Sequence, residues 1–517
     1  PVPVDPTNVH AIETRLIASG VVLDATTDDD EVAPGQSLPV TLSAWNAGRD
    51  TVWVTFAMIT HAGFASHGDQ CPQTGARAIA PATLFTCTYF SVVEPHAFPT
   101  APYYLLARRR GALYQWTGDV ANWGEPSEPP LQARFGVLFA APARGVTGYV
   151  RDGVVREVQA RIKDPVLGEV RRPVMVVPAI AVDLSPSALL WPAGVRVRPF
   201  RVSLEHLARD TSDATVSITV PKGWTTSPAQ RLHFTREGER AVLTFQVSAP
   251  RQVVLDDYRI SAQVRVGNDT MAIGLYRIRY PHVRDRNLPT AAQATATVAN
   301  VTFPVVGAIG YVRGGGDLVP EAMVNAGLGV ELLTGDALER GSLDKFKVIV
   351  IGPRAYEADE SLKRAHPRLM RWLAAGGTLV IQYQQTPYVI GGFPPIPFTL
   401  VSPTQSRVTD ETAPVTLLAK SHPVLRWPNP ITGDDFKGWV QERGLDFPPT
   451  WDPAWTPILE THDSGGPPLA GGLLVAKVGK GTAVYTGLAF HRQLPAIVPG
   501  AWRLWANILG VGRAPAH

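Results

Sequence analysis

The sequence predicts a multidomain β plus α/β protein, with two β-sandwiches followed by a three-layer α/β domain. Three observations support this prediction. The chain has 517 residues, which is too long for a single hydrophobic core. It contains 47 prolines and 46 glycines without any repeat, a composition that favours short strands and turns over long helices. Near Val301 the pattern changes from alternating polar and apolar residues to strands that alternate with helices.

Residues 1–178 are predicted to form the first β-sandwich. The runs "SLPVTLSAWNAGRD" and "TVWVTFAMI" alternate polar and apolar residues and are separated by turn residues, as half-buried strands are. A less regular part that is rich in aromatic residues follows at 63–130, and strands resume with "LQARFGVLFA". We therefore expect a sandwich with a long inserted loop region.

Residues 179–285 are predicted to form a second sandwich, of immunoglobulin-like type. Six or seven short apolar runs, among them "RPFRVSLEHLA", "ATVSITVPKGW" and "DYRISAQVRV", follow one another at the spacing of that fold. The segment 286–300, which contains "RNLPTAAQATATV", is predicted to be a linker.

Residues 301–517 are predicted to form a flavodoxin-like three-layer domain. The strand "VVGAIGYV" precedes a helix at 318–326, and the strand in "LDKFKVIVIGPRAY" precedes a helix at about 361–375. The strand "TLVIQY" follows, and the helix "GAWRLWANILG" lies near the end of the chain. Strands that alternate with helices indicate a parallel sheet covered on both faces.

Charge and hydropathy argue against several classes of partner. The 48 basic and 45 acidic residues give a net charge of +3, which is no reason to expect a nucleic acid or an acidic membrane. No run of about 18 apolar residues occurs, so no transmembrane segment is expected. The first residues, "PVPVDPTNVHAIE", have neither Met nor a signal-peptide pattern, which indicates a processed or trimmed chain.

Only two cysteines occur, Cys71 and Cys87, and they lie close together in the sequence. Two thiols alone cannot hold a structural zinc ion. We expect a disulfide between them, with two unrelated buried thiols as the alternative. A disulfide would indicate an oxidising, exported location.

The stretch "IGYVRGGGDLVPEAM" has the order of a phosphate-binding turn, because an apolar run ends in Gly314, Gly315 and Gly316 and a helical pattern follows. No Lys follows these glycines as the Walker pattern requires, and the third glycine of the dinucleotide pattern is missing. The simpler interpretation is a turn at the carboxyl edge of the first strand, with Asp317 capping the next helix at Pro320.

Other candidates for a ligand site lie at the same predicted edge of the sheet. Arg354 follows the strand "VIVIG", at the place where α/β hydrolases and amidotransferases carry a nucleophile. Gln382 and Tyr383 end the strand "TLVIQY", and His491 follows the strand in "TAVYTGLAF". In open α/β sheets, ligands bind outside the carboxyl ends of the strands.

The chemistry of these residues argues for binding rather than catalysis. No cysteine follows Cys87, so no thiolate is present for amidotransfer and no catalytic residue is predicted. Arg354 is suited to a carboxylate or phosphate ligand, or to an internal ion pair with Glu321 or Asp317. His491 is expected either to belong to the site or to be a hydrogen-bonded structural residue.

No metal site and no cofactor are predicted, because no paired-histidine motif occurs. The acidic loops "RVTDETAPV" and "PITGDDFKGWVQERGLDF" lack EF-hand spacing and are expected to be solvated, with local ion pairs. Several tryptophans in loop-like contexts either pin the loops to the body or form a recognition surface for sugars or partners. They are Trp116, Trp123, Trp439, Trp451 and Trp455.

Several motifs resemble the C-terminal half of large bacterial PIG-L/LmbE-type deacetylases. They are the run from "IGYVRGGGDLVPEAM" to "VIVIGPRAYE", and "AAGGTLVIQYQQ", "DDFKGWVQERGLDF", "GKGTAVYTGLAFHRQLPA", "WGEPSEPP" and "GEVRRPVMVVPA". The resemblance implies a last domain similar to class I glutamine amidotransferases and ThuA-like proteins, a middle sandwich similar to modules of carbohydrate enzymes, and export. The family's zinc motif A-H-P-D-D has no match, because "AHPR" at 365–368 lacks both aspartates. The deacetylase domain is therefore expected to be absent from this chain.

Three functions remain as hypotheses. The first is a non-catalytic binding or scaffolding protein, exported to the periplasm or the outer face of a membrane, that contacts a protein partner in a larger membrane-associated complex or a glycan. The second is the accessory half of a zinc-dependent N-acetylglucosamine-type deacetylase whose catalytic domain is missing from this chain. The third is a small-ligand site lined by Gly314, Gly315, Gly316, Asp317, Arg354, Gln382, Tyr383 and His491.

Overall fold

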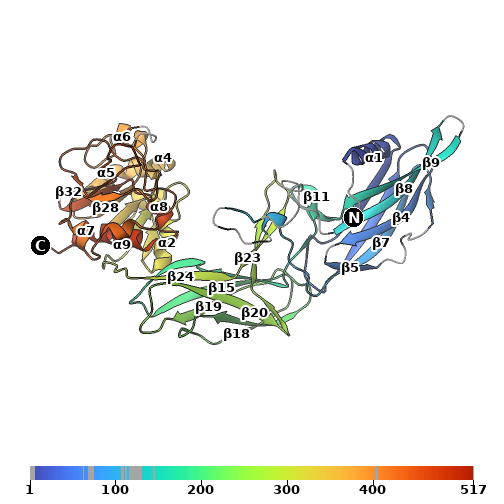
Figure 1. Cartoon of the computed structure of the whole chain (residues 1–517), viewed down its shortest axis with the longest axis horizontal. Coiled ribbons are helices and arrows are strands. Elements are labelled where there is room, and N and C mark those ends of the chain that lie inside the picture. The colour runs from blue at the N-terminus through green and yellow to red at the C-terminus, as the bar shows by residue number, and fades with distance from the viewer. Residues whose placement is uncertain are drawn as a thin grey trace.

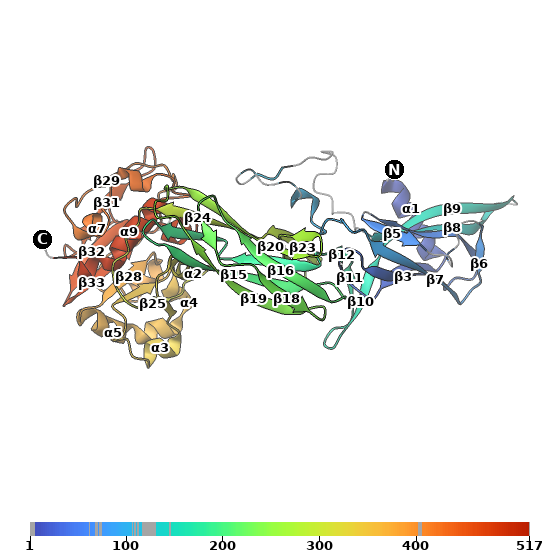
Figure 2. The ribbon, with the colours of Figure 1, turned by 90° about the horizontal axis from the view of Figure 1, so that it is seen from below.

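The computed structural model describes residues 6–61, 63–67, 71, 75–105, 107, 110, 113–115, 131–143, 146–401 and 406–515. The chain forms three bodies arranged in an elongated arc, with a β-rich body at the N-terminal end and a helix-containing body at the C-terminal end (Figure 1). A view from below shows the middle body between the other two (Figure 2). Most regular structure is β-strand in several sheets, as the sequence predicts. Among the described residues, no helix has the length and hydropathy needed to cross a membrane.

The N-terminal body is a sandwich of two sheets. One has the strand order β11-β10-β1-β3-β7-β5 and the other β6-β4-β8-β9. Strand β3 shows why the sequence folds this way, since Leu38, Val40, Leu42 and Ala44 alternate with polar residues and are buried in the core. The elements are α1 (Pro6–Ala18), β1 (Val21–Thr27), β2 (Glu31–Val32), β3 (Ser37–Asn46), β4 (Val52–His61), β5 (Phe64–His67), β6 (Arg77–Ile79), β7 (Thr83–Val93), β8 (Leu131–Ala143), β9 (Val146–Glu157), β10 (Gln159–Asp164), β11 (Gly168–Pro173) and β12 (Met175–Val176).

The predicted disulfide is confirmed, because Cys71 and Cys87 are bonded and both are buried in the core of this sandwich. The predicted irregular region at 63–130 is wrong in its first half. There β5, β6 and β7 are sandwich strands, and "TLFTCTYFSVV" of β7 alternates buried and exposed residues as any strand of the core does. Trp116 and Trp123 lie outside the described residues.

The middle body is a second sandwich, with sheets of order β13-β15-β19-β17 and β14-β24-β20-β16-β18. Its core contains Trp191 and Trp224, whose rings meet edge to face with centroids 4.8 Å apart. The strands are β13 (Ile180–Ser185), β14 (Ala188–Pro192), β15 (Val197–His206), β16 (Ser212–Thr219), β17 (Thr225–Thr226), β18 (Gln230–Phe234), β19 (Arg240–Ser248), β20 (Asp257–Val266), β21 (Asp269–Met271), β22 (Ile273–Ile278), β23 (Arg286–Ala291) and β24 (Gln293–Ala299).

The predicted linker at 286–300 is wrong, because this segment forms β23 and β24. Strand β24 pairs with β14 and β20 inside the sandwich, and β23 pairs with β22. Ala294, Ala296 and Val298 alternate with threonines and are buried. The small, weakly apolar residues of this strand resemble a linker in composition, although their period of two is that of a strand.

The C-terminal body is a seven-stranded sheet of order β26-β25-β27-β28-β33-β32-β30, parallel from β26 to β33, with helices and an apolar core on each face. Its main helices begin and end close to the predicted bounds. The elements are β25 (Ile309–Val312), α2 (Val319–Ala326), β26 (Val330–Leu332), α3 (Gly335–Glu339), β27 (Val348–Ile351), α4 (Ala355–Ala358), α5 (Glu360–Ala374), β28 (Thr378–Gln382), α6 (Thr386–Ile390), β29 (Val415–Leu417), α7 (Pro423–Arg426), β30 (Thr456–Pro457), β31 (Leu459–Thr461), β32 (Leu473–Val478), β33 (Gly481–Thr486), α8 (Phe490–Gln493) and α9 (Pro499–Gly510).

The junction between the N-terminal and middle bodies is centred on a buried carboxylate, Glu31 of β2. Its two oxygens accept hydrogen bonds from Arg277 Nε and Nη2 at 2.8 Å, from Arg279 Nη2 at 2.8 Å and from Asn287 Nδ2 at 3.1 Å. The donors come from β22, the chain just after it, and β23 of the middle body. One carboxylate of the first body is therefore held by three side chains of the second.

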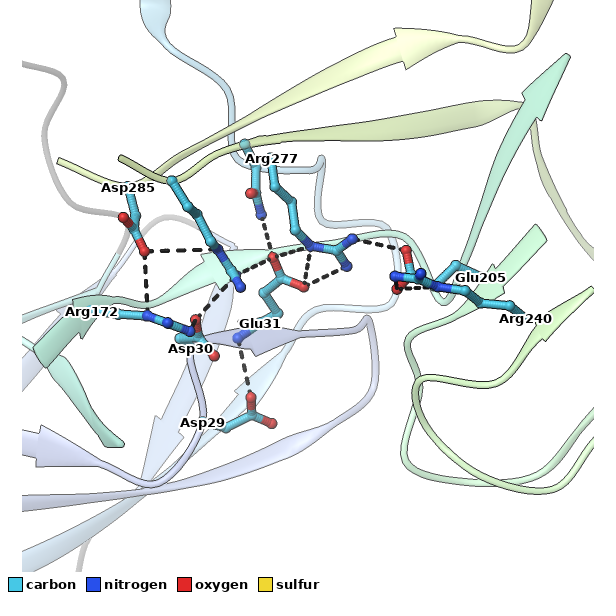
Figure 3. A network of polar contacts seen from close by, with 10 residues as sticks. Asp29, Asp30, Glu31, Arg172, Glu205, Arg240, Arg277 and Asp285 are labelled. Carbon is cyan, nitrogen blue, oxygen red and sulfur yellow. Dashed lines mark hydrogen bonds and ion pairs between the residues drawn. The ribbon is translucent and has the colours of Figure 1, made fainter. Parts of the chain in front are cut away.

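Further ion pairs flank Glu31 on both sides (Figure 3). Asp30 and Asp285 share Arg172 at 3.3 and 3.4 Å, and Glu205 binds Arg277 at 2.8 Å and Arg240 at 2.9 Å. Beside these charges, β12 pairs in parallel with β2. We call these charged residues, together with the neutral Asn287, the junction cluster: Asp30, Glu31, Arg172, Glu205, Arg240, Arg277, Arg279, Asp285 and Asn287.

The junction between the middle and C-terminal bodies consists of an apolar contact and of an arginine that caps helix α2. Leu190 of β14 belongs to the same core as Met323 of α2. Arg198 of β15 donates to the carbonyl oxygens of Asn325 and Ala326, which are the free carbonyls at the end of α2. The guanidinium thus binds the negative end of that helix, where a cation is stabilising.

Candidate functional site

The glycine turn after β25 packs closely against the next strand's turn. A Cβ on Gly314 would lie 1.9 Å from the carbonyl oxygen of Pro353, so only glycine fits there. Gly316 has φ 63°, a left-handed conformation that glycine adopts without strain. The close backbone contact therefore explains Gly314, and the left-handed turn conformation explains Gly316.

Asp317 and Gln382 belong to a buried chain of hydrogen bonds behind this turn. The Tyr311 hydroxyl donates to Asp317 Oδ2 at 2.6 Å and accepts from Gln382 Nε2 at 2.7 Å. Asp317 Oδ1 accepts from the Val319 N–H at 3.0 Å. The prediction that Asp317 caps α2 is wrong by one residue, because the N-cap position is Leu318. Burial raises the pKa of Asp317, and the Tyr311 hydrogen bond opposes that rise. Asp317 and the Gln382 amide nitrogen are thus used in structural hydrogen bonds.

Arg354 occupies a sharp turn directly after β27. Its backbone is left-handed, with φ 55° and ψ 23°, and its N–H donates to the carbonyl oxygen of Tyr383 at 2.9 Å. Non-glycine residues in this conformation are uncommon and cluster at functional sites. The side chain is 49% exposed and pairs with Glu357 at 2.8 Å. The predicted ion pair with Glu321 or Asp317 is wrong, because Arg313 pairs with Glu321 instead.

Tyr383 and His491 lie together at the ends of β28 and β33. Their ring centroids are 5.2 Å apart, and both side chains are half-buried. Burial and the nearby charge of Arg492 lower the pKa of His491 to about 4, so its imidazole is neutral near pH 7. Its Nδ1 is buried without a hydrogen-bond partner among the described residues. The alternative of a hydrogen-bonded structural histidine therefore does not hold for this nitrogen.

Asp446 is a site residue that the sequence analysis missed. Its side chain is 1% exposed, its φ is 54°, and its Oδ2 has no partner among the described residues. Burial, and then the charge of Glu357, raise the pKa of Asp446 to about 6, while Arg354 and Arg407 oppose the rise. Glu357 also has a buried oxygen, Oε1, without a partner. No motif marks these carboxylates, since they come from a loop and from a four-residue helix.

A further buried carboxylate, that of Glu442, lies beside these residues. Glu442 is 1% exposed and pairs with Arg407 at 2.7 Å and with Arg492 at 2.6 Å. The charges of Arg354, Asp446, Arg492 and Glu442 all act on Tyr383, whose pKa burial raises. The structure therefore brings Arg354, Tyr383 and His491 together as predicted, and it adds the carboxylates of Glu357 and Asp446, which the sequence does not predict. We call Arg354, Glu357, Tyr383, Asp446 and His491 the edge site.

The acidic loop around Glu442 differs from the solvated loop that was predicted. Arg443 is buried, donates to the carbonyl oxygens of Ala413 and Phe436, and lies over the Trp439 ring. Trp439 and Trp455 are themselves buried, so they pin their loops rather than form a recognition surface. Within the part of the chain that the structure describes, no group of His, Cys, Asp and Glu side chains could hold a metal ion.

Comparisons with known proteins give no relative that could name the function. The sequence matches no known protein-family profile, and no curated protein matches it. Solved structures with some similarity include the following three. A protein of unknown function from Porphyromonas gingivalis W83 has 12% identity and a TM-score of 0.17 over 54% of this chain and 99% of that chain. A cold-adapted β-galactosidase from Rahnella sp. R3 has 13% identity and a TM-score of 0.24 over 40% and 31%. Escherichia coli α2-macroglobulin activated by porcine elastase has 11% identity and a TM-score of 0.18 over 54% and 22%. Likenesses this weak carry no argument about function.

Proposed function

We propose that this chain is an exported binding and scaffolding protein that acts by contact and holds a protein partner within a larger membrane-associated complex. The observation that carries the proposal is the construction of the two junctions, one around Glu31 and one around Leu190 and Arg198. Domains joined by exposed linkers move relative to each other by default. Three bodies joined through buried contacts present distant surfaces at fixed separations, as a scaffold requires.

The finer fold classes are part of this proposal. We assign the sandwiches to the immunoglobulin-like type and the C-terminal body to the flavodoxin-like type, similar to class I glutamine amidotransferases and ThuA-like proteins. The resemblance to the accessory region of PIG-L/LmbE-type deacetylases supports this assignment. The Cys71–Cys87 disulfide supports export, because disulfides persist in oxidising compartments.

The residue at the turn after β27, Arg354, supports a binding function rather than a catalytic one. In enzymes with this kind of sheet, a strained turn after a central strand presents the nucleophile. Here a guanidinium stands at that turn and pairs with Glu357. A guanidinium stays protonated and does not attack a carbonyl group, whereas it is well suited to recognition.

The proposal is tested by purifying the tagged chain from native cell-envelope extract and weighing the complexes by native mass spectrometry. We expect a complex of defined stoichiometry that contains a second protein. A matched sample carrying Glu31→Ala should lose most of that complex, because the first two bodies would no longer hold their relative orientation. A chain that stays monomeric in the extract, or that alone releases acetate from N-acetylglucosamine derivatives in a reaction lost on chelation, would contradict the proposal.

A further inference from the structure

A groove lies between the middle body and the C-terminal body. Its volume is about 700 Å³, which is in the range of ligand-binding clefts. One wall comes from residues 255–257 and from the end of β24 at 297–300, and the other comes from residues within 432–440 and 496–503. Both views show β24 beside α9, the helix to which the last of these segments belongs (Figure 1 and Figure 2).

Arg503 of α9 holds the two walls of this groove together. Its Nη1 donates to the carbonyl oxygen of Asn300, which directly follows β24, at 2.8 Å, and its Nη2 donates to the carbonyl oxygen of Pro430 at 2.6 Å. Its Nε pairs with Asp435 at 2.7 Å, and Asp435 is itself largely buried. All three nitrogens of this guanidinium are therefore engaged, and its charge is neutralised within the chain.

Three other carboxylates of the groove are available to a partner. Asp256 and Asp257 are exposed and pair with no basic side chain among the described residues, since they accept from a backbone N–H at 2.8 Å and from the Thr297 hydroxyl at 2.6 Å. Asp434 pairs with Lys437, but both side chains are 79% exposed, and such surface pairs contribute little. The groove thus carries an excess of negative charge, although the whole chain has a net charge of +3.

Apolar side chains line the same groove. Leu255 is 57% exposed, and the mostly buried Val298 and Ile497 complete the apolar part of the lining. A bare metal ion does not fit, because in the described part of the chain no group of side chains could hold one. Lysine and arginine side chains match both properties of the groove, since each has an apolar stem and a cationic head.

We propose that this groove binds a segment of the partner protein that carries lysine or arginine side chains next to apolar ones. Asp256, Asp257 and Asp434 pair with the cationic heads, and Leu255 contacts the stems and the apolar side chains. This inference rests on the proposed scaffolding function, and it names the chemistry of the partner's segment and the place where that segment docks.

The test is isothermal titration calorimetry on the full chain with a capped pentapeptide of alternating lysine and leucine residues. We expect binding that weakens as salt is added, because salt screens partly exposed ion pairs. The double variant Asp256→Asn with Asp257→Asn should bind the peptide about tenfold more weakly, since two ion pairs of moderate strength are lost together. Leu255→Ser should weaken binding by about threefold, because it removes an apolar contact.

The matched control is the double variant Asp210→Asn with Asp269→Asn. It removes the same charge from exposed positions of the middle body outside the groove and should leave binding unchanged. Because Asp256, Asp257 and Leu255 are all exposed, loss of the fold does not imitate the expected result.

Four results of this titration would overturn the groove as a docking site. They are no binding of the lysine–leucine peptide at low salt, equal binding of a glutamate–leucine peptide, binding that survives Asp256→Asn with Asp257→Asn, and spermidine bound as tightly as the peptide. Self-association of the wild type that this double variant abolishes would also overturn it, because the occupant would then be a second copy of the chain.

Native mass spectrometry of the cell-envelope extract separates this inference from the scaffolding function. We expect the complex to form with the wild type and to be lost with Asp256→Asn plus Asp257→Asn. A complex that persists in the double variant would contradict the groove as the docking site and leave the scaffolding function standing. The absence of any complex with the wild type would contradict both.

Discussion

Replacing Glu31 with alanine is expected to lower the free energy of unfolding of the N-terminal body by about 3 kcal/mol, because removing one partner of a buried ion pair leaves the others uncompensated. Glu31 is 9% exposed, and its removal takes away the acceptor that Arg277, Arg279 and Asn287 share. Arg277 keeps Glu205 and Arg279 keeps Asp30, but the cluster then carries one positive charge in excess. Differential scanning calorimetry should then show the N-terminal body melting separately and earlier than the middle body.

The matched control is Glu169→Ala, which removes a carboxylate paired with Arg161 and Arg171 on the open surface of the same body. Exposed ion pairs contribute little, so this variant should melt like the wild type. Equal effects of the two substitutions would show that the junction cluster does not couple the bodies.

The junction also has an expected pH dependence. Burial would raise the pKa of Glu31, but the hydrogen bonds and charge of Arg277, with Asn287 and Arg279, bring that pKa below its ordinary value. The stabilisation from Glu31 is therefore present above the carboxyl pKa of the unfolded chain, near 4.5, and is lost as the pH falls through the lower folded value. Acid should thus weaken the coupling in the wild type and change Glu31→Ala much less.

Replacing Asp446 with asparagine is expected to stabilise the C-terminal body at pH 8 by about 2–3 kcal/mol. The folded pKa of Asp446 is about 6, raised by burial and by Glu357 above its ordinary value of 3.8. As the pH rises from 4 to 6, the unfolded chain gains this charge before the folded chain does, so the wild type loses stability. Asparagine carries no charge and tolerates the left-handed backbone found at this position.

The pH profile distinguishes this cause from a general effect of the substitution. The difference in melting temperature between Asp446→Asn and the wild type should be largest above pH 7 and close to zero below pH 4. Asp452→Asn, in an exposed turn of the same body, should show no such profile. A variant less stable than the wild type at pH 8 would mean that the Asp446 charge is compensated in the folded body.

Much of the architecture follows from residue patterns. The alternation in β3 and the strand–helix order after Val301 predict sheets and helices that the structure contains. Segment 286–300 is hard to predict as strand because its alanines and threonines have the period of a strand but little difference in hydropathy. Strand β7, in the first half of 63–130, is hard to predict because Pro81 and Pro95 flank it and aromatic residues lie on both of its faces.

Only those residues of the edge site that lie at the ends of predicted strands could be predicted from the sequence. Arg354 and His491 follow predicted strands and Tyr383 ends one, and parallel strands bring their carboxyl ends to one edge. Asp446 and Glu357 reach the site from a loop and a short helix, whose positions depend on packing such as the Tyr485 hydroxyl donating to the Asp446 carbonyl oxygen. The junction cluster was equally hidden, because Glu31 and Arg277 are 246 residues apart in the sequence.

Whether the bodies form one rigid arc is tested by the distribution of distances between two spin labels across the first junction. Spin labels at Glu94→Cys and Arg231→Cys, both exposed positions, place one probe in each sandwich. We expect a single narrow distribution in the wild-type background and a broader distribution when Glu31→Ala is added. A broad distribution without that substitution would mean that the two sandwiches move independently and that the chain is not a rigid scaffold.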